Sequence, residues 1–86
     1  MRLRVHGRVQ GVGFRWFVSA EARRLGLAGW VRNQPDGTVE LEAEGTPASL
    51  EVLRLRVRTG PPAARVDRIE ELPHSSAPLS QPFGSR

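Results

Sequence analysis

Apolar and polar residues alternate in two segments of the chain. The odd positions of residues 3–9 are Leu, Val, Gly and Val, whereas the even positions beside them are Arg or His. This period of two predicts a half-buried β-strand. Residues 38–44 alternate in the same way, with glutamate on the polar side. The stretch Gln-Pro-Asp-Gly before them suits a tight turn, so residues 28–34 and 38–44 are predicted to form a β-hairpin.

Apolar residues at helical spacing follow the first strand. Phe14, Phe17 and Val18 lie on one stripe of a helix predicted over residues 14–25. Two arginines in the last turn and a glycine directly after it are typical of a helix C-terminus. Glu21 lies in the same apolar stripe, and nothing in the sequence explains it.

Residues 46–59 carry two conflicting signals. Residues 53–58 alternate between apolar residues and arginine, as a strand would. The flanking residues favour a helix instead, because Thr46 can cap it, Pro47 suits its first position and Gly60 can end it. We therefore predict a helix here.

The last predicted strand covers residues 64–72. Residues 73–86 contain three prolines and four serines, which predicts a loosely held tail with a short edge strand at Phe83 as an option. The order strand–helix–strand–strand–helix–strand predicts an α+β fold, the ferredoxin-like α/β sandwich (βαββαβ), in one domain over residues 1–86. Its four-stranded antiparallel sheet would carry both helices on one face.

In this topology the first and third strands are central neighbours. The basic row of the first strand is therefore expected to pair with the acidic row of the third on the outer face of the sheet. Each opposite-charge pair would contribute roughly 0.2–1 kcal/mol. The two rows comprise Arg2, Arg4, His6 and Arg8 on one strand and Glu40, Glu42 and Glu44 on the other.

Composition narrows the class of protein. The chain has 86 residues, no cysteine and no apolar stretch long enough to cross a membrane. Its N-terminus lacks the apolar core of a signal peptide, so we expect a soluble cytoplasmic protein without disulfides. All 13 basic residues are arginine, and with 9 acidic residues the net charge is +4. This excess of basic residues suits a nucleic-acid partner or a solvated surface. The absence of lysine beside 13 arginines is part of a thermophile-like composition or reflects codon usage.

Segment 7–15, Gly-Arg-Val-Gln-Gly-Val-Gly-Phe-Arg, joins the first strand to the first helix. Amide N–H groups before a helix N-terminus favour anions, phosphate above all. Arg15 adds a planar fork that matches two phosphate oxygens. A P-loop needs lysine, which the chain lacks, and Trp16 stands where a dinucleotide-binding loop has its third glycine. The segment therefore suits one small phosphoryl group, or else is an ordinary turn that needs glycine.

Segment 7–15, followed by Leu-Gly-Leu-Ala-Gly-Trp-Val-Arg-Asn at 25–33 and Asp-Gly-Thr-Val at 36–39, resembles the acylphosphatase family. The resemblance covers residue 3 to about residue 72 and is weakest over residues 73–86. It implies a ferredoxin-like fold and a metal- and cofactor-independent hydrolase that cleaves the carboxyl–phosphate bond of acyl phosphates. Longer hydrogenase-maturation proteins carry a similar segment at their start, and the length of this chain favours a stand-alone enzyme.

The resemblance also implies roles for individual residues. Arg15 would bind the phosphoryl group, and Asn33 would position the attacking water. Taken alone, Asn33 is more typical of a turn residue. The phosphate cradle would be completed by backbone amides of the loop, those of Gln10, Gly11, Val12, Gly13 and Phe14.

Two other function classes stay open. A nucleic-acid-binding domain of this topology would stack bases on aromatic residues of its central strands, and neither 3–9 nor 38–44 contains one. A non-catalytic anion-binding domain would bind phosphate without turnover. His6 and His74 lack the spacing of metal ligands, so no metal site is predicted. The expected partner is a small acyl phosphate bound by a monomer, with neither nucleic acid nor membrane.

Three side chains are weaker candidates for a functional role. Trp16 and Trp30 could stack on bases, but we expect them to pack at the margins of the helix and the sheet. Thr38 follows the hairpin turn and could lend its hydroxyl to a site around Asn33.

Overall fold

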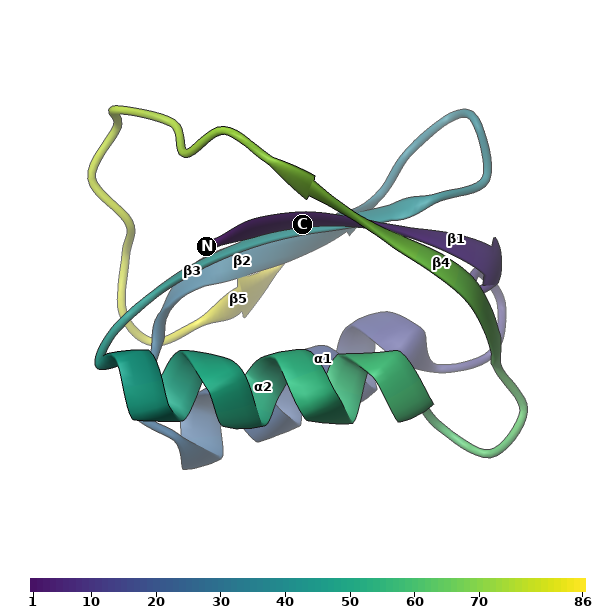
Figure 1. Cartoon of the computed structure of the whole chain (residues 1–86), viewed down its shortest axis with the longest axis horizontal. Helices are drawn as coiled ribbons and strands as arrows, with labels where there is room; N and C mark the ends of the chain where they lie inside the picture. The colour runs from purple at the N-terminus through teal and green to yellow at the C-terminus, as the bar shows by residue number, and fades with distance from the viewer.

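A computed structural model describes residues 1–86 and shows one mixed sheet of five strands with two helices on one of its faces (Figure 1). This confirms the predicted ferredoxin-like α+β fold, and the six predicted elements lie within one or two residues of their expected bounds. The helices are α1 (Phe14–Arg24) and α2 (Pro47–Thr59). In sheet order the strands are β4 (Arg65–Leu72), β1 (Arg2–Arg8), β3 (Val39–Glu44), β2 (Ala28–Asn33) and β5 (Gly84–Ser85).

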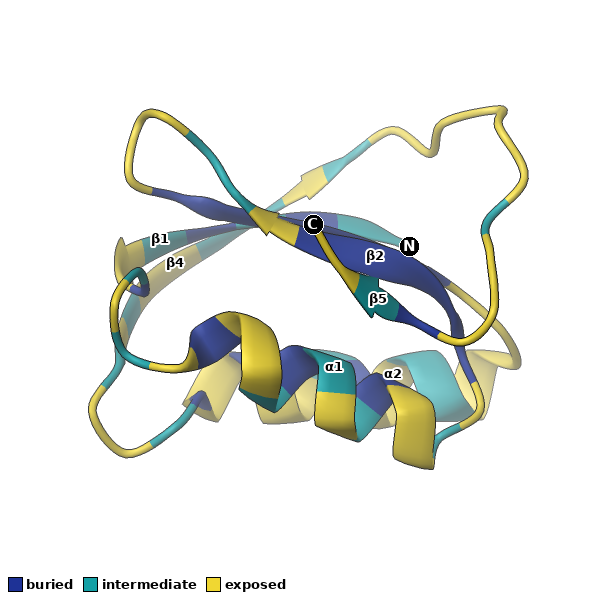
Figure 2. Ribbon diagram, turned by 180° about the vertical axis from the view of Figure 1, so that it is seen from behind, coloured by how far each residue is buried: buried dark blue, intermediate teal, exposed yellow.

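The hydrophobic core lies between the sheet and the two helices (Figure 2). Strands β1 and β3 each turn one row of aliphatic side chains toward the helices, as their alternation predicts, and β2 adds Val31. Helix α1 contributes Phe14, Val18 and Ala22, and helix α2 contributes Leu53 and Val57. Apolar residues on the far side of α2 remain in solvent, since they have no second layer to pack against.

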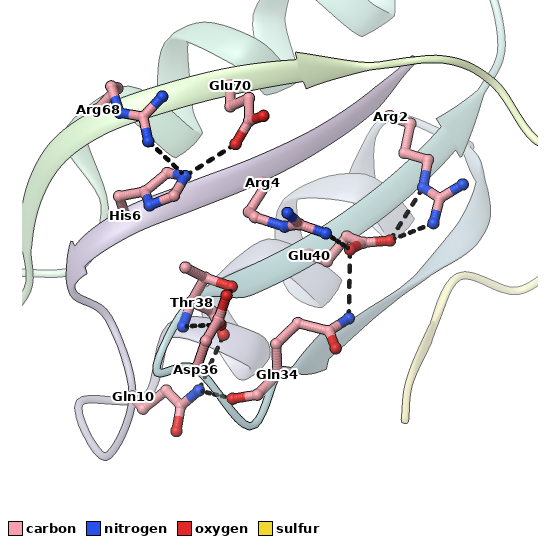
Figure 3. A network of polar contacts seen from close by, with 10 residues as sticks. All are labelled: Arg2, Arg4, His6, Gln10, Gln34, Asp36, Thr38, Glu40, Arg68 and Glu70. Atoms are coloured by element: carbon pink, nitrogen blue, oxygen red, sulfur yellow. Dashed lines mark hydrogen bonds and ion pairs between the residues drawn. The ribbon is translucent and has the colours of Figure 1, made fainter.

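The predicted charge pairing between β1 and β3 is confirmed on the outer face of the sheet, although it converges on one residue (Figure 3). Arg2 Nη2 lies 2.6 Å from Glu40 Oε2, and Arg4 Nη2 lies 3.1 Å from Glu40 Oε1. Burial alone would raise the pKa of the Glu40 carboxyl, but hydrogen bonds from both arginines outweigh it and hold the pKa below its ordinary value. Elsewhere in the basic row of β1, His6 Nε2 lies 3.0 Å from Glu70 Oε1 on β4.

Helix α2 forms where its flanking residues predicted it. The Thr46 hydroxyl accepts a hydrogen bond of 3.2 Å from the Ser49 amide, and Gly60 ends the helix. The structure also explains Glu21, the acidic residue in the apolar stripe of α1 for which the sequence offered no reason. Its carboxylate accepts hydrogen bonds from Arg24, 2.7 Å away on the same helix, and from Arg56 of α2 at 3.0 Å. Glu21 therefore links the two helices where they meet.

Residues 73–86 differ from the sequence expectation. The short edge strand expected at Phe83 is present as β5, which begins one residue later. The prediction of a loosely held tail is wrong for the last residues of the chain. Phe83 is fully buried in the core, and β5 pairs in parallel with β2. The Arg86 amide donates to Val31 O at 2.8 Å. The sheet is therefore mixed and five-stranded, because residues 73–83 cross from the β4 edge to the β2 edge (Figure 1).

Candidate active site

The segment between β1 and α1 folds into a short loop that depends on two glycines. Gly11 has φ +73° and Gly13 has φ +78°, in the left-handed region that glycine adopts without strain. Gly13 occupies the N-cap position of α1, and no side chain caps the helix there. The helix therefore begins with its N-terminal amides directed at the loop.

These amides have no acceptor within the protein. From Gln10 to Phe14, no backbone N–H donates a hydrogen bond to another residue, and the first bond of α1 runs from the Phe17 amide to Gly13 O at 3.0 Å. A row of free donors at the positive end of a helix dipole is suited to an anion. No acidic residue lies in the first turn of α1 to take that place.

Arg15 and Asn33 lie on the same cleft, which has a volume of about 570 Å³. Arg15 is the second residue of α1 and is exposed, whereas Asn33 is the half-buried last residue of β2. Most of α1 and all of β2 lie between the two residues in the sequence. They come together because β2 ends beside the β1–α1 loop. Gly11, Gly13 and Phe14 line the same cleft.

The Arg15 side chain is directed toward the end of the chain. Its Nη1 donates a hydrogen bond of 3.1 Å to the main-chain oxygen of Arg86, which follows β5. One hydrogen bond occupies one of the five N–H groups of a guanidinium. The remaining donors are available to an anion in the cleft.

Two of the predicted loop residues, Gln10 and Val12, do not line the cleft. Val12 is half-buried and packs against the core. The Gln10 side chain lies against the β2–β3 turn, where its Nε2 donates to Gln34 O and to Thr38 O, both at 2.8 Å (Figure 3). This amide therefore ties the loop to the turn that follows Asn33. Sequence reasoning considered only the Gln10 backbone and missed this contact.

Thr38 does not lend its hydroxyl to the cleft. Its Oγ1 donates to Asp36 Oδ1 at 2.6 Å, and its amide donates to the same oxygen at 3.0 Å. These two hydrogen bonds hold the pKa of the Asp36 carboxyl below its ordinary value, and the bond from the hydroxyl has the larger effect. Thr38 and Asp36 thus stabilise the turn and are not directed at the cleft.

Sequence reasoning missed one wall of the cleft, which belongs to α1. Trp16 lies at the edge of this wall and is 76% exposed, so the expectation that it packs against the fold is wrong. Trp30 is buried on the outer face of the sheet, as expected. The spacing of four residues from Arg15 to Ser19 to Arg23 is the signal that would have found this wall. The α1 residues that line the cleft beyond Arg15 are Trp16, Ser19, Ala20 and Arg23.

Elsewhere the chain offers few sites for other chemistry. His6 contacts Glu70 and Arg68, and His74 contacts the N-terminal amine. No group of three or more His, Cys, Asp or Glu side chains lies close enough to hold a metal ion. Neither helix combines the length and the apolar character that a membrane span requires.

Comparison with known proteins identifies the family of this chain. The family model for acylphosphatase matches residues 1–83. The chain is 62% identical to an acylphosphatase of Thermococcus kodakarensis over 79% of this chain and 75% of that protein. This chain is a member of the acylphosphatase family.

Solved structures show the same relationship. The crystal structure of acylphosphatase from Bacillus subtilis is 40% identical, with a TM-score of 0.85 over 99% of this chain and 94% of that one. The crystal structure of T. kodakarensis HypF is 33% identical, with a TM-score of 0.86 over 100% of this chain but only 12% of that one. The fold therefore occurs both in a chain of similar length and as a small part of a longer one.

Proposed function

We propose that this chain hydrolyses acyl phosphates to a carboxylate and inorganic phosphate. One observation carries the proposal: in a member of the acylphosphatase family, Arg15, the free loop amides and Asn33 lie at a single cleft. The cleft combines a cradle for an anion with a neutral amide side chain on the strand beside it. This combination suits transfer of a phosphoryl group to water.

In this proposal the loop and Arg15 bind the phosphoryl group. The amides of Gly11, Gly13 and Phe14, which line the cleft, point at its oxygens, and the guanidinium adds a charge-assisted, bidentate contact. These donors stand in place before the reaction, so they stabilise charge that develops on the phosphoryl oxygens without reorganisation. The Arg15 guanidinium would then bind the phosphoryl group in addition to the main-chain oxygen of Arg86.

Asn33 orients the attacking water. An amide side chain both donates and accepts hydrogen bonds, so it can align a water molecule without removing its proton. The water oxygen forms a bond to phosphorus as the bond from phosphorus to the acyl oxygen breaks, and the acyl group leaves as a carboxylate. The proton of the water goes to a phosphate oxygen of the product. Since a carboxylate leaves readily, the reaction needs neither a metal ion nor a cofactor.

Hydrolysis of acetyl phosphate in excess chelator tests the proposal. Arg15→Ala should lower kcat/KM by about 10²–10³-fold or more, because it removes a preorganised charge-stabilising donor. Asn33→Ala should lose turnover while still binding inorganic phosphate, as measured by calorimetric titration. Arg58→Ala is a matched control, because Arg58 is an exposed arginine of α2 that forms no ion pair.

Three outcomes would contradict the proposal. Turnover at the wild-type rate in Arg15→Ala would remove the role of that residue, and an equal loss in Arg58→Ala would show that net charge alone matters. Wild-type protein that binds phosphate but hydrolyses nothing would be a non-catalytic anion-binding domain. A monomeric state and a cytoplasmic location stay predictions from the sequence.

A further inference from the structure

The cleft extends well past the phosphate cradle. Arg15, Ser19 and Arg23 are four residues apart on α1, so they lie in one row along the helix and all three line the cleft. The backbone positions of Arg15 and Arg23 are about 12 Å apart along the helix axis. A phosphoryl group at the helix N-terminus would therefore leave the rest of this row to the acyl part of the substrate.

Arg23 is a second cation in the cleft, and its guanidinium is only partly used. Its Nε donates to the main-chain oxygen of Phe83 at 2.6 Å, and it forms no ion pair with a carboxylate. Phe83 is fully buried, so this contact anchors the guanidinium to the core. The two terminal nitrogens have no protein partner and are free to bind an anion.

The surroundings of Arg23 distinguish it from ordinary surface arginines. Its neighbour Arg24 is bound to Glu21, and Arg56 of α2 is bound to the same carboxylate. By contrast, no acidic residue lines the cleft that contains Arg15 and Arg23. Two arginines that line one cleft, with no acidic side chain beside them, suit a molecule that carries negative charge at both ends.

We propose that Arg23 determines specificity by binding a second negative charge on the acyl group, which selects acyl phosphates derived from dicarboxylic acids. This inference rests on the proposed function. The phosphoryl group occupies the cradle at Arg15, and the distal carboxylate meets the terminal nitrogens of Arg23. Trp16 and Ala20, which line the same wall, contact the methylene groups between the two charges.

Two substrates of matched length test this assignment. Succinyl phosphate carries a distal carboxylate where butyryl phosphate carries a methyl group. Arg23→Gln removes the charge but keeps an N–H donor for the Phe83 oxygen. It should lower kcat/KM for succinyl phosphate by about fivefold, the value of a solvent-exposed ion pair, and leave kcat/KM for butyryl phosphate unchanged. Arg24→Gln removes the same charge one residue away, outside the cleft, and should change neither.

The outcomes separate this inference from the proposed function. Equal losses for both substrates in Arg23→Gln, no loss for either, or the same selective loss in Arg24→Gln would overturn the role of Arg23 while leaving the hydrolase intact. Wild-type protein that hydrolyses neither substrate would overturn both proposals.

Discussion

Gln10 shows how much a single side chain adds at the residue scale. The sequence places it in a glycine-containing loop, and only the backbone of that loop suggested a function. In the structure its side-chain amide bridges two carbonyl oxygens of the β2–β3 turn, those of Gln34 and Thr38. The turn begins directly after Asn33, so Gln10 ties the loop to the strand end that carries the residue proposed to hold water.

Gln10→Glu should be destabilising and should impair turnover. The substitution keeps the shape but places a carboxylate oxygen against two carbonyl oxygens, so two hydrogen bonds are lost. We expect the free energy of unfolding to fall by about 2 kcal/mol in urea denaturation at pH 7, and kcat/KM to fall with it.

Gln81→Glu is the control for that change. Gln81 also donates to a carbonyl oxygen, that of Gly26 at 2.9 Å, but it is exposed and distant from the loop. Its substitution should cost less than about 1 kcal/mol and leave kinetics unaltered. Reduced stability in Gln10→Glu with unchanged kcat/KM would show that the contact stabilises the fold without positioning the site.

At the scale of elements, the helices follow from residues next to them in the sequence, whereas the last strand depends on a contact between residues far apart in the chain. Residues 53–58 alternate like a strand, yet the cap at Thr46 and the break at Gly60 prevail, because Leu53 and Val57 can reach the core only from a helix. Strand β5 has no such local signal. It forms because Phe83 enters the core beside α1 and pulls the adjacent residues against β2.

Phe83→Ala should therefore unfold a large part of the protein, contrary to the behaviour of a loose tail. Removing a fully buried phenylalanine costs about 3–5 kcal/mol, a large fraction of the stability of a small domain. Thermal unfolding followed by circular dichroism measures the change. Leu55→Ala, at a residue of α2 that is 57% exposed, should shift the midpoint little. Equal effects of the two substitutions would contradict the packing of Phe83.

Across the whole molecule, the arrangement of charge matters more than its sum. The +4 excess first suggested a polyanion partner. In the structure several arginines are bound to acidic side chains, as Arg2 and Arg4 are to Glu40, while Arg15 and Arg23 share a cleft that no acidic side chain lines. Positive charge is therefore available in this cleft, and it would steer the small anionic substrate of the proposed reaction toward it.

Stability should fall in acid, with Glu40 as a main contributor. Its pKa is lower in the folded chain than in the unfolded one, so its contribution is complete above the unfolded pKa of about 4.3 and is lost as pH falls through the folded pKa. Glu40→Gln should cost about 1–3 kcal/mol at pH 7, and its difference from wild type should shrink at pH 3. Urea denaturation at both pH values measures this.

Glu44→Gln provides the matched control, because Glu44 lies on the same strand but is exposed and forms no ion pair. It should match wild type at both pH values. A Glu40→Gln deficit that is equally large at pH 3 and pH 7 would show that shape, and not charge, accounts for the effect.

The sequence by itself determined the order of the elements, the glycine loop, and the place of Arg15 at a helix N-terminus. These features depend on interactions between near neighbours, such as alternation, capping and turn chemistry, which can be read from adjacent residues. The pairing of β1 with β3 also followed, since the topology leaves few alternatives.

Only the tertiary structure decided the fifth strand, the role of Glu21 between the helices, the Gln10 contact and the contact of Arg23 with Phe83. Each depends on residues that lie far apart in the chain, as Arg23 and Phe83 do. Their interaction arises only when the core brings them together, so no local pattern of residues encodes it.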